Sequence, residues 1–337
     1  MKLLSWLVYV PLQILAIPLA IVGASLVAYR QLIVSRRLGV SQTAIEILNG
    51  RWTLHVFGLR NDPGAAKLAP ALPNTSTSGL WLALFPLWVK ARIAGEPGLY
   101  PRIVPHERAG IAEMVPNRTA AFDEIITGHL GEVEQFVILG AGMDTRAYGA
   151  LDLVGVEVFE LDRAETQRLK RETLERAGID ASQVNFVSVD FSTEDPFEKL
   201  AAHGYDLRKK TLFLWEGVTL YLTESSVRET MARVKANAAP GSALVVDIYG
   251  ERMLALARPR VAERTLAMTG EGLQFGMSFV KDWEAELAAF VGSTTYGQGE
   301  THFMGTRHDK GPFMVVVALQ VCAPPSTGVV APTGLVP

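Results

Sequence analysis

One stretch constrains the fold of this chain more than any other. Within 136–146, the apolar run Phe-Val-Ile-Leu breaks into Gly140-Ala141-Gly142, and a helical pattern follows. Glycines at these two positions let the backbone turn sharply and approach a ligand where a side chain would collide. The alternative is a tight turn without chemical meaning, which is an ordinary role of glycine. The strand-like residues before the turn and the acids that end the next strand-like runs favour the interpretation as a nucleotide-binding turn.

The residues after the turn narrow the type of ligand. A dinucleotide fingerprint places a third glycine where this chain has Thr145, so the helix offers no close approach for a pyrophosphate. The next strand-like run, 156–162, ends in Asp162, at the position from which an acid binds ribose hydroxyls. A ribose without a diphosphate indicates S-adenosyl-L-methionine. An NAD(P)-dependent oxidoreductase is the less favoured alternative.

Strand-like and helical patterns alternate regularly from residue 116 onward, with Asn117 as the expected N-cap of the first helix. Such alternation predicts an α/β fold with a Rossmann-like, doubly wound and mostly parallel sheet over 116–322. The final strand is expected to pair antiparallel, since mixed edges are common on such sheets. The expected strands are 134–139, 156–161, 184–189, 211–215, 243–248 and 312–320.

Several motifs occur in the order of a known family. They are Leu-Gly-Ala-Gly-Met-Asp-Thr-Arg at 139–146, Phe-Glu-Leu-Asp at 159–162, Val-Asp-Phe at 189–191 and Glu-Gly-Val-Thr-Leu-Tyr-Leu at 216–222. With these motifs the chain resembles the leucine carboxyl methyltransferase-like family of S-adenosylmethionine-dependent O-methyltransferases, over roughly residues 105 to 250. The resemblance implies the class I methyltransferase fold and this cofactor.

The resemblance also implies roles for single residues. Asp190 and Phe191 match the family's adenine site, although Asp190 could instead cap the segment after it. Arg118 matches an arginine that would bind the cofactor's carboxylate, and its alternative is a helix-surface arginine paired with a nearby acid. Trp215 ends the expected fourth strand, and Glu216 and Tyr221 follow it; all three are expected to border cofactor and substrate.

Either of two acids in the second motif could bind the ribose hydroxyls. Asp162 is the first choice, since a carboxylate can accept two hydrogen bonds, but it could also cap the following helix. Glu160 lies on the same strand face and could bind the ribose hydroxyls instead.

No catalytic base is evident from the sequence. A sulfonium cofactor already carries an activated methyl group, so the protein chiefly has to orient an acceptor oxygen and exclude water. A carboxylate acceptor would need no base, whereas a hydroxyl acceptor would. Tyr221, Tyr249 and His302 are the weak catalytic candidates.

Composition excludes several classes of function. The net charge of −3 provides no electrostatic footprint for nucleic acid. The single cysteine, Cys322, cannot form an internal disulfide or a cysteine cluster for zinc, and the six histidines are scattered, so no metal site is predicted. No oligomeric state is predicted.

The N-terminus is long and apolar enough to cross a bilayer. No charged residue occurs from Leu3 to Tyr29, and roughly twenty residues suffice for a crossing. Arg30, Arg36 and Arg37 follow, which by the positive-inside rule predicts a single-pass anchor with the body in the cytoplasm. The alternative is a buried or interface-lying helical hairpin.

The remaining segments complete the expected organisation. Residues 1–37 form the anchor and its basic flank, 38–115 a helical and loop lid, and 323–337 a disordered tail. Within the lid a helix is expected from Ser41, a loop over 61–79, and a short apolar patch with Trp81 and Trp88 that lies at the membrane interface or covers the site.

The sequence thus predicts a membrane-tethered S-adenosylmethionine-dependent O-methyltransferase acting on a small lipophilic carboxylate or hydroxyl compound. The alternative from another class is a membrane-anchored S-adenosylmethionine-binding scaffold without turnover.

Overall fold

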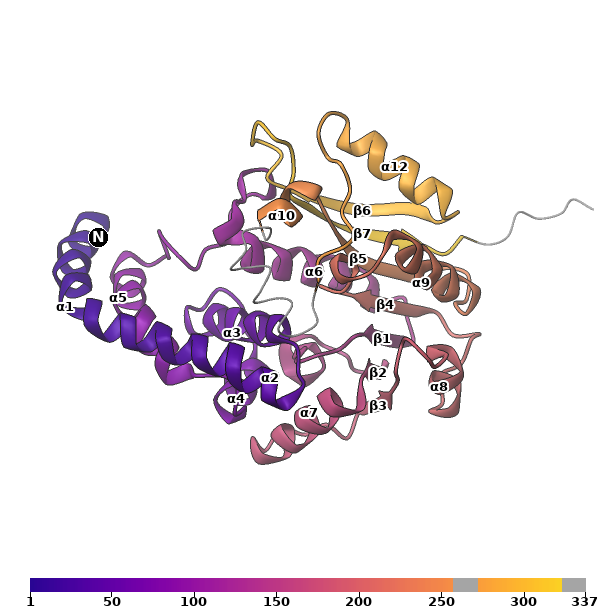
Figure 1. Ribbon diagram of the computed structural model, residues 1–337, viewed down its shortest axis with the longest axis horizontal. Helices are drawn as coiled ribbons and strands as arrows, with labels where there is room; N and C mark the ends of the chain where they lie inside the picture. Colours follow the sequence, from indigo (N-terminus) through magenta and orange to yellow (C-terminus); the bar gives the residue numbers. More distant parts are fainter. Residues whose placement is uncertain (257–271, 323–337) are drawn as a thin grey trace, which may run out of the picture.

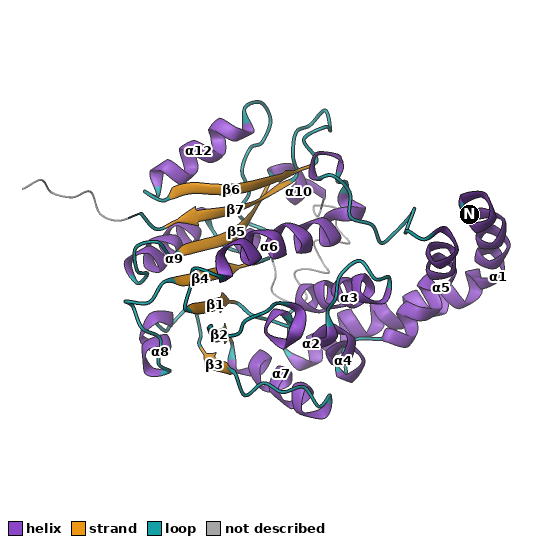
Figure 2. Ribbon diagram, turned by 180° about the vertical axis from the view of Figure 1, so that it is seen from behind, coloured by secondary structure: helices purple, strands orange, loops and turns teal. Residues whose placement is uncertain are grey.

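A central seven-stranded sheet with helices on both faces forms the body of the protein (Figures 1 and 2). The computed structural model describes residues 1–256 and 272–322. The strands are β1 (Gln135–Leu139), β2 (Glu157–Asp162), β3 (Val184–Ser188), β4 (Thr211–Trp215), β5 (Ala243–Tyr249), β6 (Gly297–Met304) and β7 (Met314–Gln320).

The strand order is β3-β2-β1-β4-β5-β7-β6. The first five strands are parallel, whereas β7 runs antiparallel to β5 and to β6. The predicted Rossmann-like, class I methyltransferase fold is therefore confirmed, together with its antiparallel final strand. Because the order reverses between β1 and β4, a crevice opens beyond their carboxyl ends, which is where such sheets bind ligands.

The parallel strands are buried on both faces, so alternate residues enter two separate hydrophobic cores. On β1, Phe136 and Ile138 join one core and Val137 and Leu139 join the other. The helices that face the first core are α3 (Gln42–Val56), α4 (Pro63–Ala71), α6 (Met114–Leu130) and α7 (Ala164–Arg176). Those that face the second are α8 (Pro196–Ala202), α9 (Glu224–Ala236) and α12 (Trp283–Ser293).

Two long helices project from this body as an arm, at the left of Figure 1. Helix α1 (Lys2–Ala28) continues through the π-helical turn η1 (Tyr29–Val34) into α2 (Ser35–Leu38). It packs along α5 (Thr77–Ala94). The continuous helix from Lys2 to Leu38 is long and apolar enough to cross a membrane.

Short helical segments connect the larger elements. They are η2 (His106–Arg108), η3 (Ile111–Glu113), η4 (Arg146–Ala150), η5 (Thr219–Tyr221) and α10 (Glu251–Leu256).

The structure corrects three local expectations. The predicted loop over 61–79 contains α4, whose first turn is capped by the side chain of Asp62. Helix α6 begins at Met114, so Asn117 lies inside the helix and binds the backbone of Val104 instead of capping. The expected strands omitted β6, since its Gly-Gln-Gly-Glu start lacks an apolar alternation. The predicted tail over 323–337 lies outside the described residues.

Candidate active site at the carboxyl ends of the strands

A cavity of about 770 Å³ opens at the carboxyl ends of β1, β2 and β4. This volume falls in the range of roughly 300–1,000 Å³ that is typical of small-molecule sites. Residues 138–144 and 215–218 line it from the sheet, and Ser41, Ala44 and Ile47 of α3 line it from above. Helix α3 begins at Gln42, directly after its N-cap Ser41, whose hydroxyl accepts the Ala44 amide at 3.2 Å. The lid region thus contributes directly to the site.

The glycine turn after β1 is shaped for close approach of a ligand. Gly140 has a φ of +71° and Gly142 a φ of +48°, a region that other residues enter only with strain. A Cβ atom at Gly140 would lie 3.0 Å from Val218, and one at Gly142 would lie 3.2 Å from Ala44. Between them, the Ala141 amide donates to the Leu161 carbonyl at 2.8 Å, which ties the turn to β2.

Asp162 lies at the end of β2 and lines the cavity. Its carboxylate accepts the Gly142 amide at 2.6 Å and the Arg163 amide at 2.7 Å. Burial raises the pKa of Asp162, while these backbone amides act in the opposite direction. The N-cap of α7 is Arg163, without a side-chain cap, so the capping alternative for Asp162 is not observed.

The surroundings of Glu160, the alternative candidate for binding the ribose, exclude it from that role. Its side chain is buried, binds the Lys170 ammonium at 2.6 Å and accepts the Tyr148 hydroxyl at 3.0 Å. It does not line the cavity. Of the two candidate acids, Glu160 and Asp162, only Asp162 therefore lines the cavity.

Asp190 and Phe191 both border the cavity, and both are exposed. One Asp190 oxygen accepts the Ser192 amide at 3.0 Å and the Ser192 hydroxyl at 2.6 Å, and these bonds lower the pKa of Asp190. The local turn-capping role is therefore present. Asp190 thus lies at the rim of the cavity. Its predicted contact with the adenine stays a prediction.

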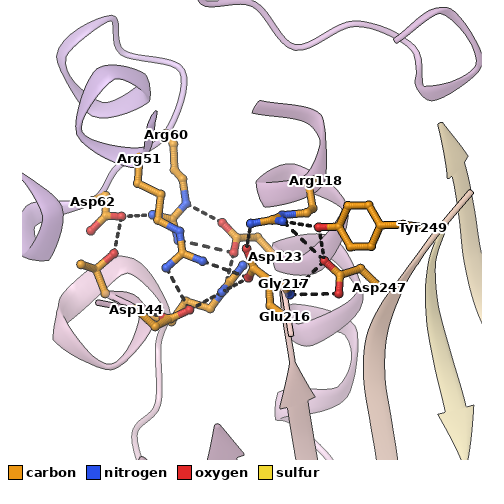
Figure 3. A network of polar contacts seen from close by, with 12 residues as sticks. Arg51, Arg60, Asp62, Arg118, Asp123, Asp144, Glu216, Gly217, Asp247 and Tyr249 are labelled. Carbon is orange, nitrogen blue, oxygen red and sulfur yellow. Dashed lines mark hydrogen bonds and ion pairs between the residues drawn. The ribbon is translucent and has the colours of Figure 1, made fainter. Parts of the chain in front are cut away.

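Arg118 is buried on α6 rather than lying on a helix surface. Its guanidinium contacts Glu216 at 3.1 Å, Asp247 at 3.5 Å and the Tyr249 hydroxyl at 2.5 Å (Figure 3). The alternative pairing with a nearby helix acid is therefore wrong. Arg118 still lines the cavity, and its buried Nε has no hydrogen-bond partner among the described residues.

Glu216 lies directly after β4 and accepts contacts from three arginines. Besides Arg118, its carboxylate lies 2.9 Å from an Arg51 nitrogen and 2.6 Å from an Arg146 nitrogen. Burial disfavours the charged form, but the attraction of Arg146, Arg51 and Arg118 outweighs it and lowers the pKa of Glu216 to about 2. Glu216 is thus a fixed anion that joins α3, α6 and η4 to the sheet.

Several members of this network were not predicted from the sequence. Arg51 and Arg146 both contact Asp144, at 2.9 Å and 2.5 Å, and hold its pKa well below the ordinary range against the opposing effect of burial. Beyond them the network continues to Arg60, Asp62 and Asp123 (Figure 3). An available signal was Arg51 itself, a charge within the mostly apolar run Ile-Leu-Asn-Gly-Arg-Trp.

The aromatic candidates have different positions. Trp215 and Tyr221 line the cavity, and the Tyr221 hydroxyl lies 2.7 Å from the Thr43 hydroxyl of α3. Tyr249 is buried behind Arg118, outside the cavity lining, and donates to Asp247 at 2.9 Å. Burial raises the pKa of Tyr249 well above its ordinary value, which favours the protonated phenol.

His302 lies on β6 and does not line the cavity. It lies with His106 and Glu124, and these three residues bring one donor atom each within 4.8 Å of one another. The Asn117 amide nitrogen is 3.1 Å from Nδ1 of His106, and Val104 fixes the orientation of that amide. Nδ1 therefore accepts a hydrogen bond and Nε2 carries the proton, so neutral His106 has no lone pair left for a metal ion.

Comparison with known proteins decides the family. The sequence profile of the leucine carboxyl methyltransferase family matches residues 61–235. The chain belongs to this family. That membership confirms S-adenosyl-L-methionine as the predicted cofactor.

Relatives of the chain occur in mycobacteria. A Mycobacterium avium (strain 104) protein named "Putative S-adenosyl-L-methionine-dependent methyltransferase" is 32% identical over 194 residues, which are 56% of this chain and 59% of the relative. A Mycobacteroides abscessus protein of the same name is 32% identical over 184 residues, covering 53% and 59%. The match thus spans about three fifths of the length of these relatives.

Solved structures share less with the chain. An O-methyltransferase family protein from Burkholderia thailandensis matches at 14% identity and a TM-score of 0.42, covering 63% of this chain and 58% of that protein. Human N-acetylserotonin methyltransferase, solved with its cofactor, matches at 13% identity and a TM-score of 0.40, covering 63% and 54%.

The residues of the site fit the family's cofactor. Both glycines of the turn line the cavity at positive φ, and Asp162 presents a carboxylate at the strand end. Buried Nε atoms of Arg51 and Arg118, both without a hydrogen-bond partner in the described residues, add positive charge at the base of the cavity. A bound group with a carboxylate, a cationic sulfur and a ribose has complementary chemistry for each of these features.

Proposed function

We propose that this protein is an S-adenosylmethionine-dependent O-methyltransferase whose acceptor is the carboxylate of a small lipophilic molecule. The observation that carries the choice of acceptor is that no histidine occurs among the described lining residues and that the most buried lining carboxylates are held in ion pairs. No histidine lines the cavity, and Asp144 and Glu216 are held by arginines. The remaining lining acids, Asp162, Asp190 and Glu229, accept hydrogen bonds from amides, a hydroxyl or an arginine.

A carboxylate acceptor needs no base, because it is ionised at neutral pH. The cofactor, when bound, supplies a methyl group already activated on a sulfonium. The chain's own residues would then bind and orient it: the glycine turn would lie under the methionine part, Asp162 would hold the ribose hydroxyls, and Arg118 would hold the carboxylate end. Helix α3 covers the cavity and excludes water, which supports catalysis by positioning.

The lipophilic character of the acceptor rests on the arm. The helix from Lys2 to Leu38 is apolar, and only 6% of its most apolar window is buried against the protein. We propose that it tethers the protein to a membrane, with the body on the side of Arg30, Arg36 and Arg37 and hence in the cytoplasm. The cavity is lined by the helix that follows this tether, so an acceptor dissolved in the membrane reaches it over a short path.

The test uses the full-length protein purified in detergent. Calorimetry with S-adenosylmethionine should show binding, and Asp162→Asn should weaken it about tenfold to a hundredfold, as expected for lost hydrogen bonds to a charged group. Asp180→Asn, an exposed acid of a loop away from the cavity, is the matched control and should bind normally.

Turnover is then measured as S-adenosylhomocysteine release with paired long-chain carboxylic acids and alcohols. We expect the acids to react, with a kcat/KM that is flat between pH 6 and 8. Reaction of the alcohols alone would contradict the carboxylate assignment. Cofactor binding without turnover on either series would instead support the scaffold alternative.

A further inference from the structure

The arm is an antiparallel helical hairpin rather than a single helix. Gly23 of α1 and Gly79 of α5 meet so closely that a Cβ atom on Gly23 would lie 2.4 Å from the Gly79 carbonyl oxygen. At the far end, the Lys2 ammonium lies 2.9 Å from the Glu96 carboxylate, and the Lys90 ammonium lies 4.5 Å from the centre of the Trp6 ring. The two helices are therefore joined along most of the length of α5.

Only one narrow stripe of α1 is covered by α5. Ser5, Ala16 and Gly23 are the buried residues of this helix. Thirteen large apolar side chains between Leu3 and Leu26 are 37–78% exposed. At the helical repeat they occupy well over half of the circumference, far more than one protein partner would cover.

The chemistry of this surface fits the interior of a bilayer. The hydroxyls of Ser5 and Ser25 donate to backbone carbonyls of the same helix, so neither requires water. Basic residues lie at both ends of the hairpin, with Lys2 and Arg92 at one end and Arg36 at the other. Apolar surface between basic ends is complementary to lipid tails and anionic headgroups.

The segment after α5 determines how deep the hairpin can insert. From Ala94 the chain turns back along the hairpin, so that Gly98 lies beside the Lys90 ammonium. Tyr100 already borders a groove of about 340 Å³ with Leu80 and Leu84 of α5. Within the described part of the chain, the amides of Glu96, Gly98, Leu99 and Tyr100 make no hydrogen bond to other backbone groups, and Pro97 has no N–H to donate. Such a segment is not tolerated in lipid hydrocarbon.

Helix α5 is also too short to cross. Its uncharged run from Thr77 to Val89 spans about 20 Å at a rise of about 1.5 Å per residue, whereas a hydrocarbon core is about 30 Å thick. Crossing by α1 would carry the attached end of α5, with Lys90, Arg92 and Glu96, through the bilayer as well. The free-energy cost of moving these charged side chains through the hydrocarbon is avoided if both ends of the α1–α5 hairpin stay at one membrane surface.

We propose that the α1–α5 hairpin embeds in a single leaflet, with the exposed face of α1 among the acyl chains and residues 95–100 at the headgroups on the side of the body. The proposal rests on the membrane tether of the proposed function and replaces a single-pass anchor by a monotopic one. The basic residues at both ends then contact the same headgroup layer.

The test labels single cysteines with a membrane-impermeant maleimide in membranes of an expressing bacterium. Wild-type Cys322, which is exposed, reports the side of the body. In a Cys322→Ser background, Arg92→Cys reports the far end of the hairpin and Leu15→Cys the middle of α1. Each variant is labelled in right-side-out spheroplasts and in inverted vesicles, with detergent as the positive control.

We expect Arg92→Cys to be labelled in the same preparation as Cys322, and Leu15→Cys only after detergent. Labelling of Arg92→Cys in the opposite preparation would show a crossing hairpin and overturn the proposal. Free labelling of Leu15→Cys, or recovery of the chain in the soluble fraction, would refute lipid embedding. Cofactor binding by the purified protein is measured separately, so failure of the tether is distinguishable from failure of the methyltransferase assignment.

Discussion

At the scale of single residues, the floor of the cavity is organised around one carboxylate. Glu216 receives guanidinium groups from Arg51, Arg118 and Arg146, which belong to three different helical segments. Each of these arginines is almost completely buried, so each would be costly without a counter-charge. Glu216 therefore stabilises the site electrostatically, and its lowered pKa makes it a poor proton acceptor.

Replacing this carboxylate should destabilise the whole protein. Glu216→Gln keeps the shape but leaves three buried cations with one anion fewer, and we expect a loss of about 3–5 kcal/mol. Glu224→Gln is the matched control, because its partner Arg228 and its own side chain are exposed, and its effect should stay within about 0.5 kcal/mol. Denaturant unfolding in detergent measures both, and equal effects would show that the arginine cluster does not depend on Glu216.

At the scale of elements, α3 is held over the cavity by a few polar contacts to the sheet side. Arg51 reaches Glu216 and Asp144, and Thr43 pairs with Tyr221 of η5. Tyr221 thus contributes to the cavity wall and also positions the helix that covers it. This arrangement explains how a lid that precedes the sheet in sequence can complete a site at the strand ends.

The contact between Thr43 and Tyr221 should appear as a coupling energy. In a double-mutant cycle of Thr43→Val and Tyr221→Phe, we expect a coupling of about 0.5–1.5 kcal/mol in stability. The control cycle pairs Thr43→Val with Tyr296→Phe, whose hydroxyl binds Met231 in the other core, and should be additive. A coupling no larger than in the control cycle would mean that this bond does not hold α3.

At the scale of the whole molecule, two buried acids should set opposite pH trends in stability. Glu216 has a pKa lowered to about 2 from 4.5, so the stability it contributes is present above pH 4.5 and is lost as the pH falls toward 2. For Asp247, burial raises the pKa from 3.8 to about 6 despite Arg118. The folded state then binds the extra proton, so stability decreases as the pH rises from about 4 to 6.

Unfolding free energy measured against pH should therefore rise from pH 2 to about 4.5 and then level or decline toward pH 6. Asp247→Asn should flatten the upper part of this profile and leave the lower part in place. A profile of the variant that keeps the decline between pH 4 and 6 would contradict the assignment of that trend to Asp247.

Much of this protein could be read from local patterns. Apolar runs of strand length predicted β1 to β5 and β7, because buried strands require apolar residues. The glycine turn and Asp162 predicted where the cavity lies, because a sharp turn requires glycine. The edge strand β6 could not be predicted in this way, because its polar, glycine-rich start resembles a loop.

The tertiary structure decided which charges meet and which surfaces are shared. The sequence alone indicated the sheet, the glycine turn and an apolar N-terminus, each of which depends on neighbours in the chain. The cluster of Arg51, Arg118 and Arg146 on Glu216 and the pairing of α1 with α5 join residues that are up to 165 positions apart. No local propensity encodes such contacts, because their energy arises only when separate elements pack and exclude water.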